Sequence, residues 1–200
     1  MKAKEFIQLF VPPIYYKVKT RLFPKRKPLY HPLPKIEHSK QRMVIIGTGP
    51  SLNMTLELYE QQLHEADCMM VNFSANTPLF ERICPAYYIM MDPGWIRQNT
   101  IYDDSIRNCV NAIKSRTEWP MTIILPSFFN QWWAIDELKK NPNITILFDE
   151  SDWHPLPDDK LFQAFEENRV CPPTYTVLTY GIYLSLYWNY METYLVGADT

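Results

Sequence analysis

The stretch Met43-Val44-Ile45-Ile46-Gly47-Thr48-Gly49-Pro50-Ser51-Leu52 decides the fold of this 200-residue chain. Four apolar residues lead into a Gly-x-Gly turn, and Pro-Ser then opens a helical pattern. This order is typical of the first strand, turn and helix of a nucleotide-binding α/β sheet. Gly47 and Gly49 permit a tight turn and the close approach of a ligand to the backbone. Ser51 can cap the helix, whose N-terminus attracts phosphate, so the turn predicts a nucleotide-phosphate site.

A dinucleotide is the rival ligand for this turn. Its fingerprint has a third glycine and an acidic residue at the end of the second strand, where the carboxylate binds the ribose hydroxyls. Here Pro50-Ser51-Leu52 replaces the third glycine, and the predicted second strand ends at the neutral Asn72. Both departures argue against a flavin or nicotinamide enzyme.

Short apolar runs alternate with helical stretches from residue 43 onward. The predicted strands are 43–47, 67–72, 86–91, 121–125, 144–148 and 193–197, and the predicted helices are 53–65, 101–116, 130–140, 159–168 and 176–190. Because strands separated by helices need crossover connections, we expect an α/β fold with a doubly wound, mostly parallel Rossmann-like sheet and helices on both faces. The helix at 176–190 is apolar nearly all round and should be buried.

Charge is divided sharply along the chain. Residues 1–42 hold eleven of the twenty lysines and arginines and only two acidic residues, a formal charge of +9, whereas residues 43–200 carry −11. We therefore divide the chain into a basic, Pro-containing arm and linker (1–42) and a Rossmann-like domain (43–200). Such an acidic domain repels phosphate backbones, which argues against nucleic-acid binding.

The arm mixes aromatic and aliphatic residues with lysine and arginine. Its apolar run, residues 6–14, is broken by Pro12-Pro13, is far shorter than the ~20 residues that span a bilayer, and precedes no signal-peptide cleavage site. We expect the arm to lie on an anionic membrane surface. The arm resembles the short Pro-Pro-containing basic leaders of bacterial surface-polysaccharide enzymes, which implies the cytoplasmic face of a bacterial plasma membrane. Packing of the arm on its own domain, or binding of a protein partner, is the alternative.

Ligands of parallel sheets lie beyond the carboxyl ends of the strands, so the residues that follow each strand are the site candidates. They are 47–51, 72–74, 92–95, 126–131, 149–150 and 198–199. These short polar side chains suit a base and a ribose, and they include no histidine to act as general base. Asn72 and Asp92 also suit turns, and Trp132-Trp133 suits a core better than a sugar-stacking platform. The acidic stretch 149–152 could chelate a metal, but we favour a solvated loop.

Cysteine and histidine are scattered, with four of each and no metal-ligand spacing. We therefore predict no metal site and expect the thiols to be reduced.

The order of the motifs resembles the bacterial sialyltransferases of glycosyltransferase family 42. The resemblance covers about residues 43–200 and rests on order and spacing rather than on any single motif. Its parts are 44–52, Asn72, Tyr87-Tyr88-Ile89-Met90-Met91-Asp92-Pro93-Gly94, Ser127-Phe128-Phe129-Asn130-Gln131, Thr179-Tyr180-Gly181 and 194–199. The chain is also similar to the motility-associated factor glycosyltransferases, whose third strand commonly ends in Asp-Pro.

The resemblance implies a GT-A-like variant of the fold and transfer of a nonulosonic acid, such as sialic acid, from its CMP ester to a surface glycan or glycolipid. It implies no metal or other cofactor, and it leaves a homo-oligomer open. Carried over to this chain, the donor-nucleotide site comprises Gly47, Thr48, Gly49, Ser51, Asn72, Asp92, Thr179 and Gly181.

This sequence departs from the family pattern at several positions. Thr48 replaces an asparagine in a turn one residue shorter, Asp92 replaces an amide, Tyr180 replaces a serine, and Val177 stands where the family has an arginine. The family continues with a lid that supplies phosphate-binding tyrosines and a histidine base. We expect this chain to be the N-terminal nucleotide-binding part, inactive alone, with Asp92 and His154 as the remaining base candidates. The alternative is a non-catalytic, membrane-tethered binding module derived from such an enzyme.

Overall fold

The computed structural model describes residues 31–97, 101–151, 156, 158–173 and 176–199. Its single sheet contains β1 (Arg42–Ile46), β2 (Asp67–Val71), β3 (Tyr87–Ile89), β4 (Met121–Pro126), β5 (Ile144–Asp149) and β6 (Glu192–Val196). Every pair of neighbours is parallel, in the order β5-β4-β3-β2-β1-β6. All six predicted strands are confirmed, and the sheet is wholly rather than mostly parallel.

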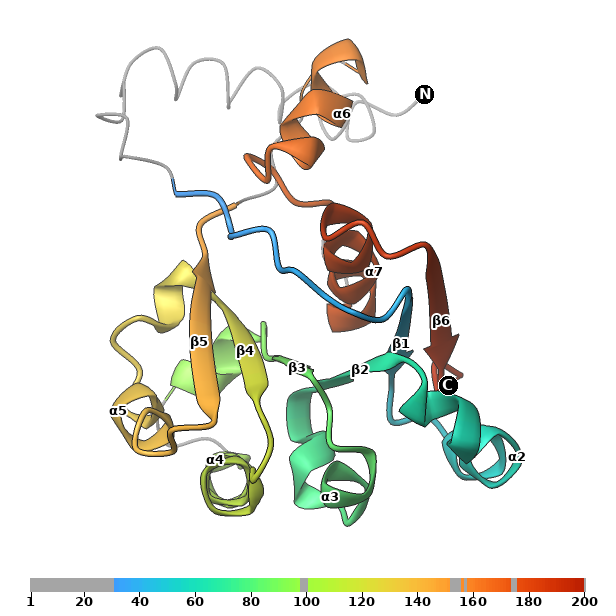
Figure 1. Ribbon diagram of the computed structural model, residues 1–200. Helices are drawn as coiled ribbons and strands as arrows, with labels where there is room; N and C mark the ends of the chain where they lie inside the picture. Colours follow the sequence, from blue (N-terminus) through green and yellow to red (C-terminus); the bar gives the residue numbers. More distant parts are fainter. Residues whose placement is uncertain (1–30, 98–100, 152–155, 157, 174–175, 200) are drawn as a thin grey trace, which may run out of the picture.

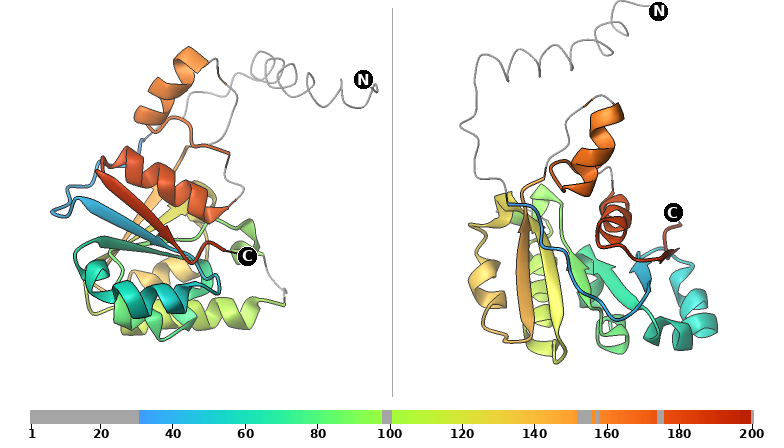
Figure 2. Two further views of the ribbon diagram at one scale, coloured as in Figure 1. Left: turned by 90° about the vertical axis from the view of Figure 1, so that its right-hand side faces the viewer. Right: turned by 45° about the horizontal axis from the view of Figure 1, so that its top comes forward.

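Helices cover both faces of the sheet, which confirms the doubly wound arrangement. One face carries α2 (Leu52–His64), α3 (Leu79–Ile83), α4 (Asp103–Arg116) and α5 (Ala134–Leu138), below the sheet in Figure 1. Strands β1 to β5 follow one another in one direction, so right-handed crossovers place these four helices on the same side. The connection from β5 to β6 returns over the other face through α6 (Asp158–Glu166) and α7 (Val177–Tyr187) (Figure 2).

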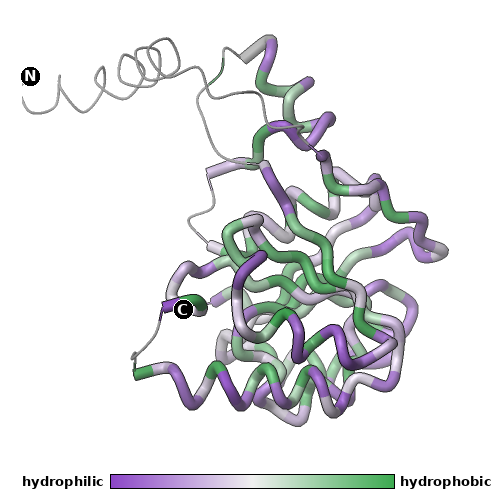
Figure 3. The backbone as a smooth tube through the Cα atoms, turned by 90° about the vertical axis from the view of Figure 1, so that its left-hand side faces the viewer, coloured by the Kyte–Doolittle hydropathy of each residue, from purple (hydrophilic) through white to green (hydrophobic). Residues whose placement is uncertain are grey.

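Strand β1 shows why the strands read as unbroken apolar runs. Val44 and Ile46 pack into the core layer beneath α2 to α5, whereas Met43 and Ile45 pack into the layer beneath α7. A strand covered on both faces is apolar at every position. The central strands accordingly form the green interior of Figure 3, while purple segments recur along the outer helices.

Two of the helical predictions need correction, and one short helix was not predicted. The helix predicted at 130–140 is only the five-residue α5, and α3 was too short for its periodicity to be recognised. Short 3-10 turns follow three strands instead: η1 (Asn72–Asn76), η2 (Pro93–Ile96) and η3 (Ser127–Phe129). Helix α7 is not buried all round, because the sheet covers only one of its sides; Leu186 is 63% exposed.

The segment 31–41, assigned to the linker by its sequence, packs on the α7 side of the sheet. Leu33 is 2% exposed; its N–H donates to Asn168 Oδ1 at 2.6 Å and its carbonyl accepts from Tyr187 Oη at 2.6 Å. The packed part of the domain therefore begins before residue 43. Residues 1–30 lie outside the described residues, and so does the predicted membrane contact of the arm. No helix in the described ranges is long and apolar enough to cross a bilayer.

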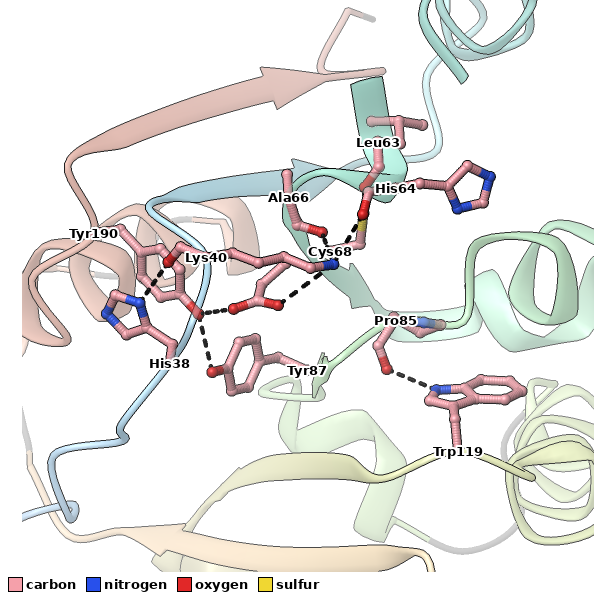
Figure 4. Close-up of polar contacts among 11 residues, drawn as sticks. His38, Lys40, Leu63, His64, Ala66, Cys68, Pro85, Tyr87, Trp119 and Tyr190 are labelled. Carbon is pink, nitrogen blue, oxygen red and sulfur yellow. Dashed lines mark hydrogen bonds and ion pairs between the residues drawn. The ribbon is translucent and has the colours of Figure 1, made fainter. Parts of the chain in front are cut away.

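A cluster of polar contacts lies at the amino ends of the strands (Figure 4). The His38 ring stacks on Tyr190 with centroids 3.8 Å apart, and the Tyr190 hydroxyl donates to Asp67 Oδ2 at 2.5 Å. Tyr87 Oη lies 3.0 Å from Tyr190 Oη, and Lys40 Nζ donates to the Ala66 carbonyl at 2.9 Å. Burial, with the hydrogen bond to the Asp67 carboxylate, raises the pKa of Tyr190, so this hydroxyl remains a donor at neutral pH. These contacts fix the linker to the sheet.

Candidate functional site

A cavity of about 870 Å³ lies at the carboxyl ends of β1 to β5, the edge at which the sequence predicts a ligand. Its wall is built from the residues just past the strands and from the start of α7. They include Gly47, Thr48, Asn72, Asp92, Pro93, Ser127, Phe128, Asp149, Glu150, Ser151, Thr176, Val177 and Leu178. Five separate strand ends thus contribute to one concave surface.

The eight predicted donor-site residues divide into two groups. Gly47, Thr48, Asn72 and Asp92 line the cavity. Gly49, Ser51, Thr179 and Gly181 are not among its lining residues. His154, a candidate base, lies outside the described residues.

The Gly-x-Gly turn is shaped by the loop that follows β6. A Cβ atom on Gly47 would lie 2.2 Å from the carbonyl oxygen of Gly197, and one on Gly49 would lie 2.4 Å from that of Asp199. Ser51 donates its N–H to Asp199 Oδ2 at 3.0 Å and its hydroxyl to Oδ1, and these hydrogen bonds lower the pKa of Asp199. Ser51 itself makes no side-chain cap, contrary to prediction. The Asp199 carboxylate therefore takes the position at the start of α2 where the sequence predicts phosphate.

Asn72 lines the cavity and also carries a buried, unsatisfied polar atom. It directly follows β2 and adopts the left-handed conformation (φ 51°), which asparagine tolerates. Its carbonyl accepts hydrogen bonds from Tyr88 Oη and from Cys109 Sγ. Its side-chain Oδ1 is buried and has no hydrogen-bond partner in the described part of the chain. A buried acceptor left unpaired costs roughly 1–3 kcal/mol.

Asp92 combines the turn role with a position in the wall. Its Oδ1 accepts the N–H of Gly94 at 2.7 Å and so caps η2, as the turn alternative predicts. Asp92 is exposed and lines the cavity. Oδ1 of Asp92 therefore stabilises the η2 turn, and Oδ2 takes no part in that hydrogen bond.

The two predicted donor residues of α7 serve the helix itself. The N–H of Thr179 donates to Oγ1 of Thr176, the residue that caps α7. Gly181 is buried, and a Cβ atom there would lie 3.2 Å from the Ile45 side chain. Gly181 therefore lets α7 pack closely on β1.

Asp149 is buried, and the expectation of a solvated loop is wrong at this position. Asp149 is 3% exposed and lines the cavity. Its Oδ1 accepts from Ser151 N at 2.8 Å and Asn168 Nδ2 at 3.3 Å, and its Oδ2 accepts from Ser151 Oγ at 2.6 Å and from the Tyr180 hydroxyl. Four donors stabilise the carboxylate without an ion pair in the described ranges. Burial, with the nearby Asp149 charge, raises the pKa of Tyr180 well above its ordinary value, so Tyr180 stays a donor.

The described wall of the cavity is acidic. Asp92, Asp149 and Glu150 line it, and its described lining residues include no lysine, arginine or histidine. No group of three or more His, Cys, Asp or Glu side chains that could hold a metal ion occurs within the described ranges. Positive potential comes instead from the first turn of α7, where backbone N–H groups lack intrahelical acceptors.

No protein-family model matches this sequence, and no curated protein matches it. Among solved structures, the chain is similar to the MAf glycosyltransferase from Magnetospirillum magneticum AMB-1, with a TM-score of 0.56 and 18% sequence identity. The alignment covers 85% of this chain and 24% of that chain, so this chain spans about a quarter of its length. At this identity the likeness shows the fold, a Rossmann-like arrangement found in a glycosyltransferase.

Proposed function

We propose that this chain forms the donor-nucleotide-binding part of a glycosyltransferase that resembles the family 42 sialyltransferases. The observation that carries the proposal is the cavity at five parallel strand ends, whose wall includes Asn72 and other short polar residues. The similar fold of the MAf glycosyltransferase supports sugar transfer. The proposed donor is a CMP-activated nonulosonic acid, the proposed acceptor is a surface glycan or glycolipid, and no metal or other cofactor takes part.

The chemistry of the wall favours a nucleotide with one phosphate. Asn72 lines the cavity, and a side-chain amide can hydrogen-bond a base or a ribose hydroxyl. The N–H groups of Val177 and Leu178, in the first turn of α7 and in the same cavity wall, suit a phosphate. Additional phosphate charge would meet the carboxylates of Asp92 and Glu150 without a neutralising side chain in the described wall.

The proposed reaction is an inverting displacement at the anomeric carbon of the donor. The acceptor hydroxyl oxygen forms a bond to that carbon while the carbon–oxygen bond to phosphate breaks, and CMP leaves with the bonding electrons. A base takes the hydroxyl proton, and the N-terminus of α7 stabilises the leaving phosphate. Of the described carboxylates, Asp92 is the better base candidate, because Asp149 already accepts four hydrogen bonds.

The saturated hydrogen bonding of Asp149 is also the observation that favours the second candidate, a non-catalytic nucleotide-binding module. Asp149 already accepts four hydrogen bonds, and the described wall contains no histidine. The cavity therefore has groups that can bind a nucleotide but few that can accept a proton. For either candidate we propose a peripheral position on the inner face of a bacterial plasma membrane, supported by the charge of +9 in residues 1–42. A homo-oligomer would use the edge strand β6, where Tyr194 and Leu195 are exposed.

Calorimetric titration with CMP, CDP, UMP, UDP, GDP and NAD tests the donor site. We expect CMP to bind most tightly, and the proposal fails if NAD binds better or if no nucleotide binds. In an assay of transfer from CMP-sialic acid to lactose, with free hydrolysis measured in parallel, we expect no turnover by this chain alone. Clear turnover that is lost in Asp92→Asn would overturn that expectation, identify the base and exclude the non-catalytic binding module.

A further inference from the structure

We propose that an aromatic surface beside the cavity binds the pyranose rings of the acceptor glycan. This inference rests on the proposed function, because an acceptor must lie next to the donor. The surface, here called the aromatic rim, consists of Phe128, Trp133 and the polar side chains of Asn130 and Gln131. Phe128 and Trp133 are 45% and 46% exposed, and Phe128 also lines the cavity. The rim is therefore continuous with the predicted donor site.

Each exposed ring of the rim is backed by a buried ring. Phe128 and Phe129 have centroids 5.0 Å apart, and Trp132 and Trp133 have centroids 5.8 Å apart. The backing rings, Phe129 and Trp132, meet edge to face at 5.3 Å and are 0% and 5% exposed. Packing of this kind fixes the orientation of the exposed rings, so little side-chain entropy is lost when a ligand binds.

The support of the rim extends to the loops after β2 and β3. Trp95 of η2 meets Trp132 edge to face at 6.0 Å, and Phe73 of η1 stacks on Trp95 at 4.5 Å. Trp132 Nε1 is buried and has no acceptor among the described residues. The loops that form the cavity wall thus also pack against the aromatic rim. The unpaired Trp132 Nε1 lies among these packed rings.

Polar groups accompany the exposed rings, with the Arg107 guanidinium over one face of Trp133. The Arg107 guanidinium carbon lies 5.6 Å from the centre of the Trp133 ring, and Asn130 and Gln131 are exposed on the same loop. A pyranose has an apolar C–H face that can pack on an aromatic ring and hydroxyls that need donors and acceptors at its edge. Arg107 and the two amides supply both. The acidic cavity next to the rim disfavours a phosphodiester chain as the occupant.

Saturation-transfer NMR with lacto-N-neotetraose, a neutral tetrasaccharide of pyranoses, tests the aromatic rim. We expect saturation of the ring C–H protons by the wild-type chain, at least fivefold weaker binding in Trp133→Ala, and recovery in Trp133→Tyr. Tyr59→Ala, which removes an exposed aromatic side chain of α2, should bind the glycan as the wild type does. Thermal unfolding of each variant checks that the fold is retained.

Calorimetry with CMP on the same proteins distinguishes failure of this inference from failure of the proposed function. Trp133 does not line the cavity, so Trp133→Ala should bind CMP within twofold of the wild type. If CMP binds and the tetrasaccharide does not, the rim is not an acceptor site and the donor proposal stands. If the tetrasaccharide binds through Trp133 and no nucleotide binds, the donor proposal is wrong. Equal glycan loss in Tyr59→Ala and Trp133→Ala would also overturn the inference.

Discussion

Replacement of Tyr180 by phenylalanine tests the buried contact between β5 and α7. Tyr180 is fully buried, and its hydroxyl donates to Oδ2 of Asp149. Phenylalanine keeps the ring and removes one hydrogen bond to a charged acceptor, which contributes about 1.5–3 kcal/mol. We therefore expect the free energy of unfolding to fall by roughly 2 kcal/mol at pH 7. For a chain of this length, that loss lowers the Tm by roughly 4–8 °C.

Urea unfolding followed by circular dichroism measures this change. Tyr194→Phe is the matched control, because the Tyr194 hydroxyl is exposed and bonds to an exposed Glu192, and it should leave stability unchanged. The folded-state pKa of Tyr180 is raised, so its contribution is fully present below about pH 10, the unfolded value, and declines as the pH rises further. The reasoning is refuted if Tyr180→Phe is as stable as Tyr194→Phe, or if their difference grows above pH 10.

Three further predictions concern the turn, the thiols and the arm. Gly49→Ala should lower the free energy of unfolding by about 1–3 kcal/mol or more, because its Cβ atom would lie 2.4 Å from a backbone oxygen. Gly94→Ala is the control in the same thermal-unfolding assay and should lose less stability, because its Cβ atom would lie 3.1 Å from a side-chain oxygen. Burial raises the pKa of Cys68 and Cys109 to about 12. Between about pH 9 and 12, each thiol should therefore lower the free energy of unfolding by about 1.4 kcal/mol per pH unit. Replacing both cysteines by alanine should flatten the measured dependence of the free energy of unfolding on pH. Deletion of residues 1–30 should weaken binding to anionic vesicles in a sedimentation assay, since each Lys or Arg near the surface contributes about 1 kcal/mol; unchanged binding would exclude the arm as the anchor.

The strands could be predicted from the sequence because their signal is local. Met43 to Ile46 are apolar without a break, and parallel strands covered on both faces require that pattern. The positions of Asn72, just after β2, and of the turn at Asp92 could be predicted for the same reason, since both residues directly follow an apolar run. The strand-end rule then predicted the edge of the sheet at which the cavity lies.

Contacts between distant segments could not be predicted. The Asp149–Tyr180 hydrogen bond joins residues 31 positions apart, and the Ser51–Asp199 contact joins residues 148 positions apart. No periodicity encodes such pairs, so Asp149 was assigned to a solvated loop and the start of α2 to a phosphate. Trp133 shows the same limit, because its partial exposure depends on how Trp132 fills the core beneath it.

The affinity of CMP for Asn72→Gly, measured by calorimetry beside the wild type, tests the central claim most directly. Glycine suits the left-handed backbone at this position (φ 51°), so the substitution removes the amide without straining the chain. Asn189→Gly is the matched control, since Asn189 is also left-handed (φ 62°) and lies at the other end of α7 from the cavity. We predict that CMP binds the wild type and Asn189→Gly equally and binds Asn72→Gly about tenfold more weakly, the loss of one hydrogen bond. Equal affinity for all three proteins, or no binding of CMP to the wild type, would contradict the account.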